Sequence, residues 1–160
     1  MSSDGTSTGI GVAREHPGAA ALIQRWFDQV WNEANAESID DLTAQDIQMW
    51  GISRPGTPSR GTMEFKTFYA RIREAFPDTH IALEQVVQQG DTAFARWTAT
   101  MTHTGEGLPV PPTNQALTIC GMSACRVLHG KIVESWNVWD QMGMARQLGL
   151  LPGQIAEIFS

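Results

Sequence analysis

The spacing of apolar residues changes from a helical to a strand period near the middle of the chain. Between Pro17 and about Asn35, and again over residues 61–76, apolar residues recur every three or four positions, which predicts two amphipathic helices. Ser38 is placed to cap a further short helix that ends at Leu42. The stripes consist of Ala21, Leu22, Trp26, Phe27, Val30 and Trp31, and of Phe65, Phe68, Tyr69, Ile72 and Phe76.

The second half of the chain predicts a run of strands joined by tight turns at Gly90 and Gly130. In the second long strand, Ala93, Ala95, Trp97 and Ala99 alternate with Phe94, Arg96, Thr98 and Thr100, so the two sets lie on opposite faces. Helices followed by antiparallel strands indicate an α+β fold, in which a curved sheet wraps around the helices and leaves a pocket. The expected strands cover residues 47–50, 80–88, 92–103, 116–128 and 131–139, and a last helix covers 141–148.

Composition limits the function classes. The 160 residues suit one domain, expected over residues 13–160 after a disordered tail at 1–12. The net charge of −6 and the lack of a basic patch argue against a nucleic-acid partner. No apolar run is long enough to span a membrane and no signal peptide is recognisable, so we expect a cytoplasmic protein. Cys120 and Cys125 fall on opposite faces of one strand and cannot pair, and no residue spacing indicates a metal site.

Five short motifs follow one another in the last third of the chain: Thr102-His103-Thr104-Gly105-Glu106, Pro111-Pro112-Thr113-Asn114, Gly130-Lys131-Ile132-Val133-Glu134, Trp136-Asn137-Val138-Trp139-Asp140 and Arg146-Gln147-Leu148-Gly149. In order and spacing they resemble the SnoaL-like polyketide cyclase family. The resemblance implies an NTF2-like cone with an internal pocket, a cofactor-free cyclase or isomerase, and a small hydrophobic or aromatic substrate. It also implies a homodimer or higher oligomer formed through the open face of the sheet.

The chain departs from that family at the expected catalytic positions. The family's pocket aspartate, seven residues after the hairpin glycine, aligns with Asn137, and a pocket histidine aligns with Ser123. A carboxamide cannot transfer a proton, but it can stabilise an enolate oxygen. Limonene-epoxide hydrolases, which share the cone, have an Arg-x-Asp pair where this chain has Arg96-Trp97-Thr98.

Three further residues are candidates for catalysis, each with a structural alternative. Asp140 is a candidate acid or the N-cap of the helix that follows it. Arg96 is a candidate clamp for an anion or carbonyl, or the partner of Glu84 or Glu134 in an ion pair. His103 is a candidate acid or base, or an anchor for the loop over residues 105–112.

The expected pocket combines polar and aromatic side chains. Arg96, Thr98, Ser123 and Asn137 are expected to form its polar face. Trp50, Trp136, Trp139 and Met122 are candidates to hold a flat substrate, or else are core residues, and Trp139 is favoured because it shares the face of Asn137. The sequence thus supports three hypotheses: a cyclase or isomerase, an epoxide hydrolase or other water-adding enzyme, and a non-catalytic ligand-binding protein.

Overall fold

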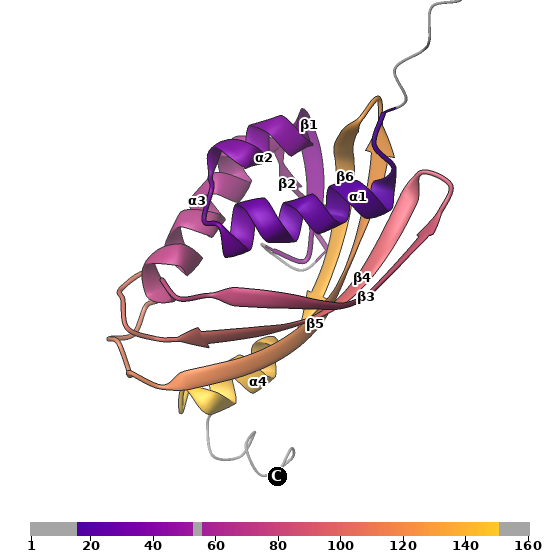
Figure 1. Ribbon diagram of the computed structural model, residues 1–160. Coiled ribbons are helices and arrows are strands. Elements are labelled where there is room, and N and C mark those ends of the chain that lie inside the picture. The colour runs from indigo at the N-terminus through magenta and orange to yellow at the C-terminus, as the bar shows by residue number, and fades with distance from the viewer. Residues whose placement is uncertain (1–15, 53–55, 151–160) are drawn as a thin grey trace, which may run out of the picture.

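The computed structural model describes residues 16–52 and 56–150, and these form a curved sheet with helices on its inner side (Figure 1). The predicted tail at residues 1–12 lies outside the described residues. The helical elements are α1 (Ala19–Arg25), the π-helix η1 (Trp26–Asn32), α2 (Glu37–Leu42), α3 (Gly61–Ala75) and α4 (Gln141–Gln147). The strands are β1 (Thr43–Trp50), β2 (Ser59–Arg60), β3 (His80–Gln89), β4 (Thr92–Thr102), β5 (Ala116–Leu128) and β6 (Lys131–Trp139).

The strands form one six-stranded sheet in the order β2-β1-β6-β5-β4-β3. All neighbours are antiparallel except β1 and β6, which run parallel. Strands β3 to β6 follow one another as hairpins, which is the arrangement that the turn signals at Gly90 and Gly130 predict. The predicted α+β class and the mainly antiparallel curved sheet are therefore confirmed.

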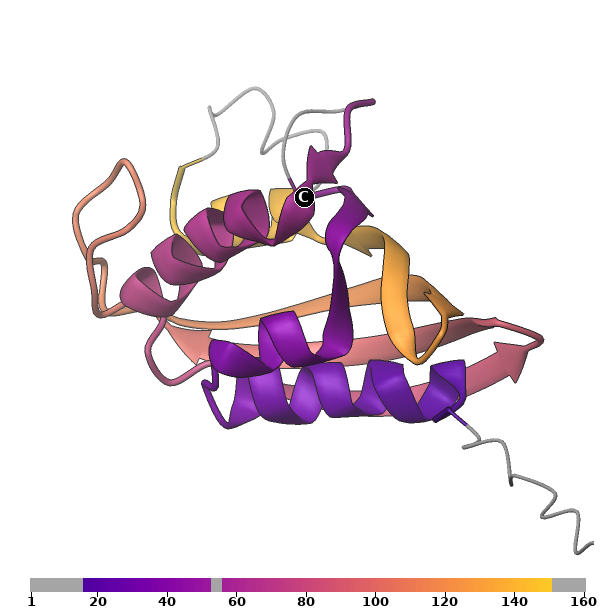
Figure 2. The same ribbon diagram turned by 90° about the horizontal axis from the view of Figure 1, so that it is seen from above.

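The helices cover only one face of this sheet. Seen from above, α1, η1 and α3 stand over the same face, and the strands form a layer beneath them (Figure 2). The core lies between these layers and includes Phe27 and Val30 of η1, Phe65 of α3 and Trp97 of β4. A sheet that curves around helices in this way encloses space between the two layers, and that is where a site can form.

The first helix differs from its prediction in its second half. The apolar pattern predicts one helix from Pro17 to about Asn35, but the α-helix ends at Arg25 and continues as seven residues of π-helix. Backbone bonds of this wider type extend beyond it, as from the Glu33 N–H to the Asp28 carbonyl (2.8 Å). A π-helix is wider than an α-helix and is frequent at functional sites. The apolar spacing predicts a helical face but does not distinguish the two helix types.

The short second helix is capped differently from the prediction. Ser38 lies inside α2 and is buried, so it is not the cap that the sequence suggested. The Asn35 side chain instead accepts a hydrogen bond from the Glu37 N–H (3.0 Å). Both residue types are good acceptors at helix starts, and the helix begins two positions earlier than expected.

None of the helices in the described ranges, 16–52 and 56–150, is both long and apolar enough to cross a membrane.

Candidate functional site

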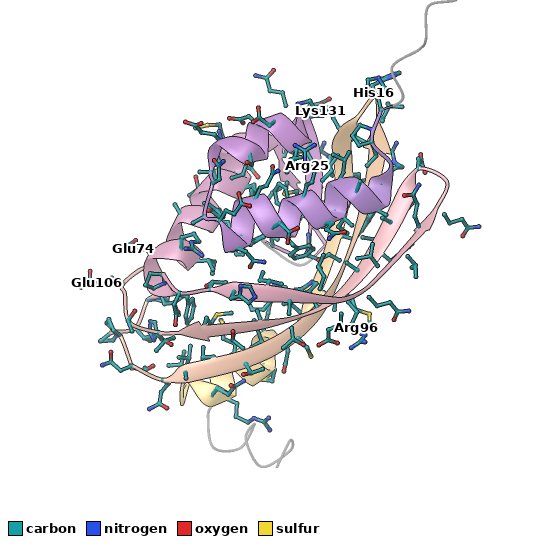
Figure 3. The ribbon with its side chains drawn as sticks, viewed as in Figure 1. His16, Arg25, Glu74, Arg96, Glu106 and Lys131 are labelled. Carbon is teal, nitrogen blue, oxygen red and sulfur yellow. The ribbon has the colours of Figure 1, made fainter. Side chains whose placement is uncertain are left out.

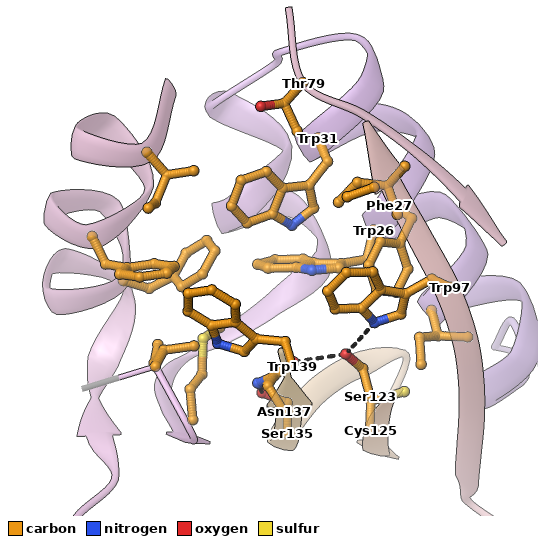
Figure 4. A pocket seen from close by; sticks show the side chains of 18 of the residues that line it. Trp26, Phe27, Trp31, Thr79, Trp97, Ser123, Cys125, Ser135, Asn137 and Trp139 are labelled. Atoms are coloured by element: carbon orange, nitrogen blue, oxygen red, sulfur yellow. Dashed lines mark hydrogen bonds between the residues drawn. The ribbon is translucent and has the colours of Figure 1, made fainter. Parts of the chain in front are cut away.

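An apolar cavity lies between the inner face of the sheet and the helices η1 and α3 (Figure 4). Its volume is about 100 Å³. Small-molecule pockets are typically about 300–1,000 Å³, so a ring-sized ligand requires some of the lining side chains to shift. Aromatic side chains dominate the lining, and they are Trp26, Phe27, Trp31, Phe65, Phe68, Phe76, Trp97 and Trp139.

A chain of hydrogen bonds forms the polar floor of this cavity (Figure 4). The indole N–H of Trp97 donates to Ser123 Oγ (3.1 Å), and Ser123 Oγ donates to Asn137 Oδ1 (2.9 Å). An indole nitrogen only donates, so the Ser123 hydroxyl must accept from Trp97 and direct its own proton to Asn137. The direction of the chain is therefore fixed by the chemistry of its first member.

This direction also fixes which way the Asn137 amide faces. With Oδ1 accepting from Ser123, Nδ2 donates to the Trp50 carbonyl (3.1 Å) and makes a longer contact with Ser135 Oγ (3.4 Å). A carboxylate at this position would place a negative oxygen against the Trp50 carbonyl instead of a donor. The end of β1 therefore favours an amide over an acid at position 137.

Two glycines let the aromatic and polar groups approach so closely. A Cβ on Gly51 would lie 1.8 Å from the Asn137 carbonyl oxygen, and Gly51 also adopts a positive φ of 80°. A Cβ on Gly121 would lie 2.3 Å from the Trp97 ring. Gly51 thus brings the chain after β1 against β6, and Gly121 leaves the space on β5 that the Trp97 indole occupies.

The described residues that line the cavity include no aspartate, glutamate, lysine, arginine or histidine. The one titratable group among them is the thiol of Cys125, and burial raises its pKa to about 11. At neutral pH these side chains are therefore uncharged. The lining supplies apolar surface and neutral hydrogen bonds, and it lacks a carboxylate or imidazole that could exchange a proton.

Comparison with known proteins identifies the family. The model of the family described as SnoaL-like polyketide cyclase matches residues 21–148. The chain belongs to the SnoaL-like polyketide cyclase family. A comparison with curated proteins gave no match.

Several solved structures resemble this chain over most of its length. IdmH from Streptomyces antibioticus, put forward as a polyketide cyclase, is 28% identical, with a TM-score of 0.72 and coverage of 82% of this chain and 98% of IdmH. AclR from Streptomyces galilaeus, put forward as a hydroxylase, is 25% identical, with a TM-score of 0.73 and coverage of 86% and 91%. A SnoaL-like protein from Jannaschia sp. CCS1 is 18% identical and supports the fold alone, with a TM-score of 0.75 and coverage of 88% and 100%.

Three of the residues expected at the site of this SnoaL-like protein lie together in the cavity. Ser123, Asn137 and Trp139 all line it, and Trp139 also donates from Nε1 to the Gly51 carbonyl (3.3 Å). The expectation that Trp139 shares the face of Asn137 is confirmed. Trp50 does not line the cavity, because Met49 is the residue of β1 that faces inward. Trp50 contributes only its backbone carbonyl, which accepts the hydrogen bond from Asn137.

Arg96, Thr98 and Met122 lie on the other face of the sheet, contrary to the expected polar pocket face. Ala95, not Arg96, pairs with Ser123, and Met122 pairs with Arg96, so this set faces away from Asn137. Figure 3 places Arg96 on the outer side of the sheet, away from the helices. The sequence predicted the alternation within β4 correctly, but the pairing register decides which neighbours share each face.

Arg96 and Thr98 both bind Glu84, which confirms the ion-pair alternative for Arg96. The register of β3 against β4 shifts between Leu83 and Gln85, so Glu84 has no direct partner in the ladder. Its side chain lies on the outer face with both residues. The arginine is half exposed and already paired, and the cavity is on the opposite side of the sheet.

Asp140 is the cap of α4 and does not line the cavity. Its Oδ1 accepts from the Gly143 N–H (2.7 Å), which is the capping bond that the sequence offered as the alternative to an acid. A Cβ on Gly143 would lie 1.9 Å from Asp140 Oδ2, so the glycine provides the space that the cap needs. Helix α4 contributes Met144, rather than Asp140, to the cavity.

His103 anchors the loop after β4, as its structural alternative predicted. Its ring is fully buried beside Phe76, and Nδ1 accepts from the Thr113 N–H (3.2 Å) and contacts Thr113 Oγ1 (3.1 Å). The backbone of His103 also bonds to Asn114 and Gln115. Its side chain is not part of the cavity lining, so the catalytic alternative has no support from its position.

Sequence reasoning missed the helical side of the site. Trp26, Trp31 and Phe65 belong to the stripes that predict the two amphipathic helices, and their spacing indicated burial only. Trp97 was placed correctly on the face opposite Arg96, yet that face was not chosen as the pocket face. The available signal was the presence of Trp26 and Trp31 on one apolar stripe, because indoles combine a large apolar ring with a polar N–H.

Proposed function

We propose that this protein is a cofactor-independent cyclase or isomerase that acts on an uncharged, polyketide-like intermediate in its aromatic cavity. Membership of the SnoaL-like family supports the reaction class. The uncharged lining supports a neutral substrate, because an ion buried there without a partner would lose its hydration. The observation that carries the proposal is the hydrogen-bonded floor, Trp97–Ser123–Asn137, inside that apolar cavity.

The proposed contribution of the cavity is to hold a flexible substrate in a reactive, folded conformation. Fixing two reacting groups of one molecule next to each other removes much of the entropic barrier to ring closure. Asn137 adds an electrostatic contribution. Its contact with Ser135 Oγ is long at 3.4 Å, so a substrate oxygen can replace Ser135 as the acceptor of that Nδ2–H hydrogen bond. The bond would stabilise the oxygen as negative charge develops on it.

The proposal assigns no proton transfer to Asp140 or His103. Asp140 is engaged as a helix cap, His103 as a loop anchor, and neither lines the cavity. Proton transfers are left to the substrate and to water. Epoxide hydrolysis, considered from the sequence, needs a carboxylate that holds a water molecule, and the described lining supplies no such group.

The proposal predicts a rate enhancement that does not depend on pH. The test is ring closure of aromatic β-ketoesters with a tethered ketone, followed by chromatography with and without protein. The ratio of the two rates should stay constant between about pH 6 and 9, because no described lining group titrates there and the Cys125 pKa is about 11. A bell-shaped dependence of this ratio on pH would contradict the proposal, since it would require an acid or base at the reaction centre.

A non-catalytic ligand-binding protein is the second candidate, and one observation favours it. The Asn137 amide ties β6 to the end of β1 through the Trp50 carbonyl, which is sufficient to explain an amide at this position without catalysis. This candidate predicts stoichiometric binding of the β-ketoesters with no product above the buffer rate. Turnover with the same compounds would exclude it.

We also propose that two copies of the chain pair through the open outer face of the sheet. Five apolar side chains are exposed there, namely Val87, Phe94, Met122, Trp136 and Val138. Exposed apolar patches of this kind are typical of interaction sites. The Arg96–Glu84 pair beside the patch adds polar groups of both signs, which suits a self-complementary contact.

A further inference from the structure

Two tryptophans of η1, Trp26 and Trp31, face the cavity opposite its polar floor (Figure 4). Both indole rings pack against Phe65 of α3, with ring centroids 4.9 and 6.3 Å away. Figure 4 shows the indole nitrogens of both residues turned toward the space between the helices and the floor. Their N–H groups are polar groups on the helical side of the cavity, as Asn137 and Ser123 are on the sheet side.

The π-helical conformation places these two residues side by side. In an α-helix, positions five apart are separated by roughly 140° around the axis and face different directions. The i to i+5 pattern of a π-helix brings such positions nearly onto one line. Trp26 and Trp31 are five apart, and the π-helix begins at the first of them and includes the second. The unusual helix therefore aligns both indoles on the cavity.

In the part of the chain that the structure describes, the indole N–H groups of Trp26 and Trp31 are free to bind a ligand, whereas the donors near the floor already have protein partners. Trp97 donates to Ser123, Trp139 donates to Gly51, and Asn137 donates to Trp50 and Ser135. By contrast, the N–H groups of Trp26 and Trp31 have no hydrogen-bond partner within residues 16–52 and 56–150. Neither belongs to the fully buried polar atoms without a partner, which here are Trp50 Nε1 and His103 Nε2.

We propose that the N–H groups of Trp26 and Trp31 select the ligand: a flat, uncharged molecule that carries a carbonyl or similar acceptor oxygen on the edge facing η1. An indole N–H only donates, so it forms a hydrogen bond with an acceptor on the ligand but not with a hydrocarbon edge or another donor. A carboxylate is also an acceptor, but its charge would be buried among neutral side chains. This assignment rests on the proposed function in one respect, namely that the cavity binds the substrate.

Three matched probes test the selection by isothermal titration calorimetry: α-tetralone, tetralin and tetralin carboxylate. They share one ring system and differ in a ketone, no acceptor, or a charged acceptor. The wild-type protein should bind the ketone about tenfold more tightly than the hydrocarbon, and the carboxylate should bind most weakly. Trp31→Phe and Trp26→Phe should each reduce the ketone preference about threefold, and the double variant should abolish it.

Trp136→Phe is the matched control, because it makes the same change on the outer face of the sheet. Trp136 is partly exposed and belongs to the apolar patch on the outer face instead of the cavity. The control should retain the full ketone preference. A preference that survives in both single variants and in the double variant, or that disappears in Trp136→Phe, would overturn the assignment. Equal or tighter binding of the carboxylate would do the same.

Folding and function can be separated from this result. Circular dichroism and thermal unfolding check each variant, and if the double variant does not fold, the two single variants decide. Ketone selectivity without turnover of any β-ketoester would remove the proposed function and leave the selection intact. Turnover together with equal binding of ketone and hydrocarbon would remove the selection and leave the proposed function intact.

Discussion

The two faces of the sheet are built from alternate residues of the same strands, yet they differ in what they offer a partner. The inner face presents Trp97, Ser123 and Asn137, which are tied to one another by hydrogen bonds under a cover of helices. The outer face presents Met122 and Val138 to solvent, with exposed fractions of 62% and 75%. The inner face carries only neutral polar groups within its apolar lining, whereas the outer face combines an exposed apolar patch with the charged Arg96–Glu84 pair.

This difference indicates that each face serves a different kind of partner. A covered cavity with directed hydrogen bonds can fix the orientation of a small molecule. An open apolar patch has no such directionality and gains free energy from area alone, as in an interface between proteins. Substitutions on neighbouring residues of one strand therefore separate the two roles.

The largest effect is expected at Gly121, which faces inward next to the outward-facing Met122. Gly121→Ala places a methyl group 2.3 Å from the Trp97 ring, and this buried indole cannot move without losing its bond to Ser123. Such overpacking should lower the free energy of unfolding by about 3 kcal/mol in urea denaturation. Met122→Ala, the adjacent change on the exposed face, should stay within about 0.5 kcal/mol. Similar losses for both variants would contradict the contrast between the faces.

A smaller effect is expected for Asn137→Asp, which introduces the acid that the family resemblance implies at this position. The Trp50 carbonyl would lose its donor and face a carboxylate, which should cost about 2 kcal/mol of unfolding free energy at pH 8. Folding should raise the pKa of the introduced carboxyl above its unfolded value. The deficit is then present at high pH and disappears as the pH falls through the folded pKa, because the protonated acid can donate.

Gln85→Glu is the control for this charge change, since Gln85 is exposed on the outer face. It should change the free energy of unfolding by no more than about 0.5 kcal/mol, both at pH 8 and at the lower pH where the carboxyl introduced by Asn137→Asp is protonated. A stable Asn137→Asp protein with no pH dependence would mean that the Trp50 contact does not select an amide. In that case the binding-protein alternative would lose the observation that favours it.

The smallest change in free energy is expected for the outer patch. Val138→Arg should weaken the proposed self-association at least about tenfold in sedimentation experiments, because an arginine would be buried without a partner. Met63→Arg is the matched control, since Met63 is 74% exposed and lies on α3, away from the sheet. A wild-type protein that sediments as a monomer, or equal effects of both variants, would refute the proposed pairing.

Much of the fold follows from local sequence patterns. The predicted bounds of β5 and β6 match those observed, and the other main elements differ by a few residues, because turn residues such as Gly90 and Gly130 mark strand ends clearly. The opposite faces of Cys120 and Cys125 are also confirmed, one exposed and one buried. The site was predicted less well. Its polar face was expected to combine Arg96 with Asn137, and this was wrong because local alternation does not give the register between strands.

The sequence by itself determined the family, through the order of its motifs along the chain. It also determined the α+β class and the two alternating faces of each strand, because these depend on residue spacing within single elements. It also offered the correct structural role for Asp140, Arg96 and His103, since caps, ion pairs and loop anchors rest on residue type. Only the tertiary structure decided which face became the cavity. Register, the shift at Glu84 and the π-helix that aligns Trp26 with Trp31 depend on contacts between distant segments, and no local pattern encodes them.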